Sequence, residues 1–166
     1  METERQERER RGVVRQANLL LRVVIKNLEP FFYVFTNLQL NDVLSTWNKL
    51  TDLLHDRASA VALTDVDYRA LEAFWSRFGK MIAMAQDETR KWEEGGESAR
   101  EYPSTPEERR LYLGQLFSDP LGLLEEAVNT LGDEDVRRDF AELQRHAETL
   151  METMTQRAEL RWQRKL

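Results

Sequence analysis

The sequence contains no cysteine among its 166 residues. A disulfide framework, a thiolate nucleophile, a cysteine-based zinc site and an iron–sulfur cluster are therefore excluded within this chain. The two histidines, His55 and His146, are too few to form a three-histidine metal site. Because a chain without cysteine suits a reducing compartment, we expect a cytoplasmic protein.

Glycine and proline are also scarce, with 7 and 4 residues respectively. Their combined share is about half of what is usual in globular proteins. A fold made of many short strands needs these residues at its tight turns, so their scarcity argues against such a fold. A small number of long helices is the expected alternative.

No apolar run is long enough for a membrane-spanning helix. The most apolar stretch, residues 19–40, is interrupted by Arg22, Lys26, Glu29 and Pro30, whereas a spanning helix needs about 18 or more apolar residues. The first residues, METERQERERR, are too charged for a secretory signal. We therefore expect a soluble chain with no membrane partner.

The charge is unevenly distributed along the chain. Lysine and arginine number 24 and the acids number 30, which gives a net charge of −6. Residues 10–28 nevertheless contain five basic residues and no acid, while residues 119–135 contain six acids and no base. The overall charge disfavours broad phosphate binding, but a local basic surface remains compatible with it.

Apolar residues recur at helical spacing through most of the chain. In the first segment they stand at intervals of 3, 4, 3 and 4, which predicts a helix over residues 2–28. Asn41, Thr64 and Thr105 are suitable N-caps and predict helices over 42–58, 65–94 and 105–118, with Val66 on the buried face of the second. Two further helices are expected over 120–131 and from 134 towards the C-terminus.

The last of these helices carries a regular narrow seam. Its members recur at intervals of 4, 3, 4, 3 and 4, and they are Val136, Phe140, Leu143, Ala147, Leu150 and Met154. Such a seam packs inside a bundle or pairs with another chain as a coiled coil. The predicted fold is an all-α antiparallel bundle of four long helices plus one or two short ones. Its parts are a charged, solvated extension (1–12), the bundle (13–156) and a basic helix end (157–166).

No arrangement of residues predicts an enzyme. Asp52 and His55, and likewise Glu142 and His146, share a helical face, but neither pair completes the carboxylate–histidine motif of a di-metal bundle. Nucleophile elbows, phosphate-binding loops and H-E-x-x-H motifs are absent from the sequence. We therefore predict no catalytic residue, no metal, no cofactor and no small-molecule substrate.

Aromatic residues point instead to contact with another protein or with a second copy. The tract Phe31–Phe35 is either core or an exposed docking patch, and Trp162 stands beyond the end of a buried stripe. We predict a non-enzymatic interaction or assembly module, with a dimer through the last helix as its simplest form. Its predicted contact residues are Phe31, Phe35, Met154, Arg161 and Trp162.

A nucleic-acid-associated subunit is the alternative prediction. Five basic residues follow one face of the first helix, with Asn18 between them, and they would grip phosphates without reading sequence. They are Arg8, Arg11, Arg15, Arg22 and Lys26. The competing interpretation is an ordinary solvated face paired with acids on neighbouring helices. No aromatic residue is interleaved with the basic ones to stack on bases.

Overall fold

The structure is a computed structural model that describes residues 2–32, 40–95 and 105–164. The described residues form helices and no strands, so the predicted all-α fold is confirmed. In chain order the elements are α1 (Glu2–Leu28), the 3₁₀ helix η1 (Glu29–Phe32), α2 (Leu40–His55), α3 (Arg57–Ala62), α4 (Asp65–Glu94), α5 (Pro106–Ser118), α6 (Leu121–Leu131) and α7 (Glu134–Arg164).

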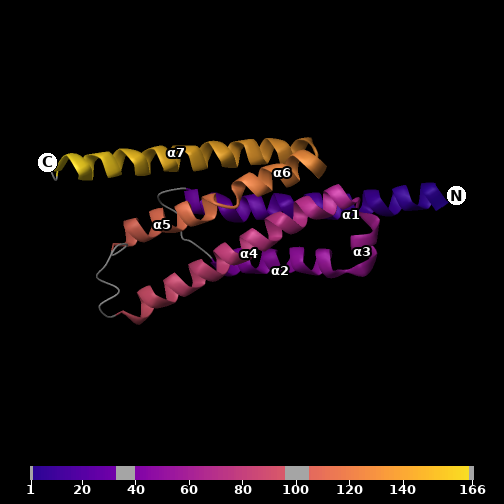
Figure 1. Cartoon of the computed structure of the whole chain (residues 1–166), viewed down its shortest axis with the longest axis horizontal. Coiled ribbons are helices and arrows are strands. Elements are labelled where there is room, and N and C mark those ends of the chain that lie inside the picture. Colours follow the sequence, from indigo (N-terminus) through magenta and orange to yellow (C-terminus); the bar gives the residue numbers. More distant parts are fainter. Residues whose placement is uncertain (1, 33–39, 96–104, 165–166) are drawn as a thin grey trace.

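The bundle is made of α1, α2, α4 and α7, together with the shorter α5 and α6. The chain reverses direction from α1 to α2 and again from α2 to α4 (Figure 1). Helices α5 and α6 together make one return run, so that α7 runs in the same direction as α1. Four long helices are present, as predicted, and the described part contains three short α-helices rather than one or two.

The helix starts read from the sequence are confirmed at two threonines. The Thr64 hydroxyl accepts a hydrogen bond from the Asp67 backbone N–H at 3.2 Å and begins α4. Thr105 accepts from the Glu108 N–H at 3.1 Å, and the Glu108 carboxylate accepts from the Thr105 N–H in return. This capping box satisfies two backbone donors that the start of α5 would otherwise leave unpaired.

The expected helix over 42–58 is wrong in its boundaries. Helix α2 begins earlier, at Leu40, and ends at His55, after which Asp56 begins α3. The Asp56 side chain accepts from the Ser59 N–H at 3.0 Å and thereby caps the new helix. Val66 was also misplaced, because its side chain is 67% exposed. The neighbouring Asp67 turns inward in its place.

The core is built around α1, which contacts α2, α3, α6, α7 and η1. Phenylalanine side chains from three other elements meet beside it. The Phe31 ring of η1 lies 4.4 Å from that of Phe117 on α5, and Phe117 lies 6.3 Å from Phe78 on α4. Burying a side chain of this size contributes about 1.5–3 kcal/mol. Phe31 thus connects α5 to the rest of the bundle.

The seam of the last helix faces this core. From Val136 to Leu150 its members are buried, and Met154 is half-buried at the edge. The seam therefore packs within the chain, one of the two arrangements that its spacing permits. Within the residues that the structure describes, no helix has the length and apolarity needed to cross a membrane.

Candidate functional site

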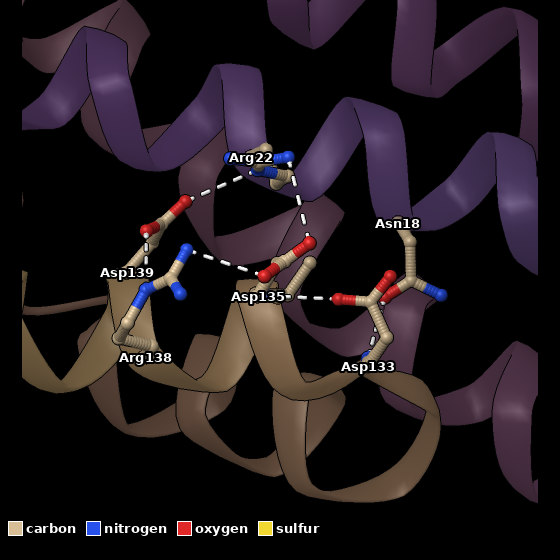
Figure 2. A network of polar contacts seen from close by, with 7 residues as sticks. Asn18, Arg22, Asp133, Asp135, Arg138 and Asp139 are labelled. Atoms are coloured by element: carbon tan, nitrogen blue, oxygen red, sulfur yellow. Dashed lines mark hydrogen bonds and ion pairs between the residues drawn. The ribbon is translucent and has the colours of Figure 1, made fainter.

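Two arginines of α1 pair with acids on other helices, and one of them, Arg22, belongs to the predicted basic face. Figure 2 shows Arg22 between two carboxylates of α7, at 3.1 Å from Asp139 and 4.0 Å from Asp135. Arg10, which lies on a different side of α1 from this face, pairs with the buried Asp67 of α4 at 3.0 Å. These contacts support the interpretation in which basic residues of α1 pair with neighbouring helices.

Asn18 lies within the same stretch but is buried, with 6% of its surface exposed. Its amide nitrogen donates to the carbonyl oxygen of Leu131 at 3.0 Å. Its oxygen accepts from the Asp133 N–H at 2.9 Å, as Figure 2 shows. These partners form the connection between α6 and α7. Asn18 is therefore a structural clamp between α1 and the connection of α6 to α7.

The remaining basic residues of that face are differently placed. Arg8, Arg15 and Lys26 are exposed, and Arg11 is exposed and pairs only along its own helix, with Glu7 at 3.8 Å. Leu19, which is also exposed, stands among them. No aromatic side chain belongs to this face, so it lacks a platform on which bases could stack.

The two histidines, His55 and His146, lie on α2 and α7. Among the residues that the structure describes, no three histidine, aspartate or glutamate side chains are arranged to hold a metal ion. His146 instead lies near Glu29, whose pKa is raised chiefly by burial and further by Glu142. The charge of His146 acts in the opposite direction and lowers the same pKa.

Three of the four tryptophans pack within the chain. The rings of Trp47 and Trp75 stack at 5.5 Å, and Trp47 Nε1 donates to the Trp75 carbonyl oxygen at 2.9 Å. Trp92 lies edge-on to Tyr112 at 5.8 Å. All three are half-buried, whereas Trp162 on α7 is 69% exposed.

The end of α7 that carries Trp162 projects beyond the rest of the bundle, as its yellow ribbon shows in Figure 1. Arg157, which bonds Glu107 of α5 at 2.5 Å, still lies against the bundle. The described side chains beyond it are all exposed, and Leu160 is among them. A large indole on a solvated helix end has no role in the core of this chain.

Trp162 continues a second stripe on α7, which we call the outer stripe. Its members are Met151, Thr155, Ala158 and Trp162. They stand at intervals of 4, 3 and 4, so they share one helical face. All four are exposed, and this face is distinct from the buried seam that ends at Met154.

A groove between α6 and α7 begins where the outer stripe begins. Its volume is about 470 Å³. It is lined by Ser118, Leu121, Gly122, Glu125, Gln144, Ala147, Glu148, Met151 and Glu152. Three of these residues are glutamates and none is basic. The groove therefore offers apolar contacts, from Leu121, Ala147 and Met151, within an acidic rim.

A second groove, between α4 and α5, has a volume of about 520 Å³. It is spanned by Arg77, which forms a two-armed ion pair with Asp119 and donates to Asp119 Oδ2 at 2.9 Å. This contact lowers the pKa of Asp119, mainly through the hydrogen bond from the guanidinium. Because Arg77 and Asp119 neutralise each other, this ion pair leaves less charge in the groove for binding a partner.

The predicted contact residues fall into separate environments. Phe31 is buried at 3% exposure, which favours the core interpretation of its tract, and Phe35 lies outside the described residues. Met154 is half-buried and Trp162 is exposed. Arg161 belongs to α7, but its side chain is outside what the structure describes.

Met151 and the groove were missed in the sequence, although the 4, 3, 4 spacing that ends at Trp162 was visible there. No family model matches the chain, and no curated protein or solved structure matches it either. The site's own geometry therefore carries the functional argument.

Proposed function

We propose that this protein is a non-enzymatic interaction or assembly module whose contact surface is the outer stripe of α7 and the projecting end beyond it. The observation that carries the proposal is Trp162, 69% exposed on a helix end that extends past the bundle. Tryptophan is the residue type most enriched among the energetic anchors of protein interfaces. A cytoplasmic location belongs to the same proposal.

The energetics favour burial of this end on a partner. A tryptophan buries on the order of 200 Å² in an interface, and removing apolar surface from water contributes about 25 cal/mol per Å². Transferring the exposed part of Trp162 to a partner therefore contributes about 3 kcal/mol. Met151, on the same face of the helix, adds to this, while neighbouring charges set the orientation of the partner.

The alternative function, binding a nucleic-acid backbone through α1, has less support. Of its five predicted residues, Arg22 is engaged by two acids of α7 and Arg11 pairs with Glu7, and no aromatic side chain lies among them to stack on bases. A filter-binding assay with single-stranded RNA at low salt separates the two functions. Retention that falls steeply with added salt would favour the alternative, because phosphate contacts release counterions.

In-cell photo-crosslinking tests the interaction function. A photoreactive amino acid at position 162 should give a covalent adduct with another polypeptide, whether a second copy or a different protein. The same group at Val66, an exposed apolar residue on α4 away from the projecting end, is the matched control. If position 162 gives no more adduct than position 66, the proposed function is wrong.

A further inference from the structure

We infer that the occupant of the acidic groove is the projecting end of α7 from a second copy of this chain, so that two copies form an antiparallel dimer. The inference rests on the proposed function and names its partner. Three independent observations support it, namely the spacing of the outer stripe, the charge at its two ends and the free face that it occupies.

The outer stripe has a spacing that matches itself when reversed. Its intervals of 4, 3 and 4 read the same from either end. A two-fold axis between Thr155 and Ala158 therefore places Trp162 opposite Met151 of the second copy, and Thr155 opposite Ala158. Residues 151 and 162 are about 16 Å apart along a helix that rises 1.5 Å per residue. Trp162 of each copy therefore meets Met151 of the other copy, and the two contacts are equivalent by symmetry.

The two ends of the stripe carry opposite charge. At the groove end, Glu125, Glu148 and Glu152 line the surface without a basic residue. At the projecting end the sequence has Arg161, Arg164 and Lys165. In the antiparallel register, residues 161–164 of one copy stand at the height of residues 149–152 of the other. A parallel pair would instead align acids with acids and bases with bases, which is unfavourable.

The groove has room for an aromatic anchor. A Cβ atom added at Gly122 on its wall would meet nothing within 4 Å, so the wall is open at that point. Met151 contributes a flexible thioether, and methionine adapts its shape to an aromatic ring placed against it. Leu121 and Ala147 complete the apolar part of the lining.

The rest of the bundle leaves this face of α7 accessible. Helix α5 packs mainly on another face, where Leu150, Thr153 and Arg157 line a small cavity with Glu107 and Arg110. Leu150, Thr153 and Arg157 therefore lie on a different side of α7 from the outer stripe. The last residue of α5, Ser118, also reaches the stripe, where its hydroxyl donates to the Met151 sulfur at 3.9 Å. A second copy can therefore approach the stripe without displacing α5.

Sedimentation equilibrium of the purified full chain tests the dimer. We expect a concentration-dependent dimer, and Trp162→Ala should weaken its association about tenfold or more, as loss of an interface anchor does. Val66→Ala, at an equally exposed residue away from the stripe, should leave the association constant unchanged. Because Trp162 is exposed, the variant should keep its helical circular dichroism and melting temperature.

Charge reversal gives the sharper test. Reversing the groove with Glu148→Lys and Glu152→Lys should abolish self-association, as should reversing the end with Arg161→Glu and Arg164→Glu. Mixing the two reversed chains should restore a dimer, because in the mixed pair each groove again meets an end of opposite charge. A parallel mixed pair would also match opposite charges, so restoration shows that these charges lie at the interface. The antiparallel register is selected by the wild-type dimer, in which a parallel pair would align like charges.

A wild-type chain that stays monomeric at about 100 µM, or reversed chains that do not associate when mixed, would overturn the dimer. The photo-crosslinking result then separates this failure from failure of the proposed function. A monomeric chain whose position 162 crosslinks to a different protein keeps the interaction function and loses the second copy as partner. A monomeric chain without any adduct at 162 loses both.

Discussion

Asn18 and Asp133, 115 positions apart in the sequence, are joined by a hydrogen bond from the Asp133 backbone N–H to the Asn18 side-chain oxygen at 2.9 Å. The Asn18 amide nitrogen also donates to the carbonyl oxygens of Val14 and Leu131, at 2.9 and 3.0 Å. One buried side chain thus satisfies both a donor and an acceptor in the connection between α6 and α7.

Replacing Asn18 with alanine should lower the free energy of unfolding by about 2 kcal/mol, because the Leu131 carbonyl and the Asp133 N–H lose their partner where Asn18 is buried. Urea denaturation followed by circular dichroism measures the change. Asn48→Ala, at an exposed position of α2, is the control and should alter the midpoint little. If Asn18→Ala and Asn48→Ala had equal urea midpoints, the hydrogen bonds of Asn18 would not contribute to stability as expected.

Gly114→Ala should destabilise the protein, whereas Gly12→Ala should stabilise it. A Cβ at Gly114 would lie 2.7 Å from the Phe31 carbonyl oxygen and even closer to the Leu150 side chain, so α5 must shift. Overpacking of this kind costs about 1–3 kcal/mol. Gly12 is exposed in α1 with nothing within 4 Å of its added Cβ, so alanine there should contribute about 0.5–1 kcal/mol. Thermal melting of both variants tests the opposite signs.

The Arg77–Asp119 ion pair should make stability depend on pH in the acid range. Its hydrogen bond lowers the pKa of Asp119 below the 3.8 of an unperturbed aspartate. The stabilisation is therefore fully present above the unfolded pKa, and it is lost as pH falls through the folded pKa. Because both side chains are about 40% exposed, its size should stay below about 1 kcal/mol.

Asp119→Asn should consequently be less stable than wild type at pH 7, and the difference should shrink as the pH is lowered to 2. Urea midpoints at the two pH values measure this, with the exposed Asp52→Asn on α2 as the control. A difference that persists unchanged at pH 2 would show that the charge of Asp119 is not responsible.

Local chemistry explains which helices could be read from the sequence. The threonine caps at Thr64 and Thr105 act on backbone groups three residues away, so their effect is visible in a short window. The break at Asp56 was missed, because no glycine or proline accompanies it and the apolar spacing continues around it. Its capping role is clear only once the Ser59 N–H is seen to point at its carboxylate.

Contacts between distant segments explain what the sequence did not reveal. Asn18 resembles the polar residues around it, and its burial depends on Leu131 and Asp133. The aromatic tract was ambiguous because the ring that covers Phe31 is Phe117, on α5. The sequence alone showed that Trp162 lies beyond the buried seam. It could not show the groove, because the groove forms only where α6 packs against α7.

The span of the Asn18 clamp also matters while the chain is being made. Translation at about 5–20 residues per second leaves an interval on the order of ten seconds between the synthesis of Asn18 and that of Asp133. Throughout that interval this face of α1 lacks its α7 cover, and any chaperone bound there must leave before the bundle can close. Termination before Asp133 would release a chain whose first helix cannot complete its native contacts.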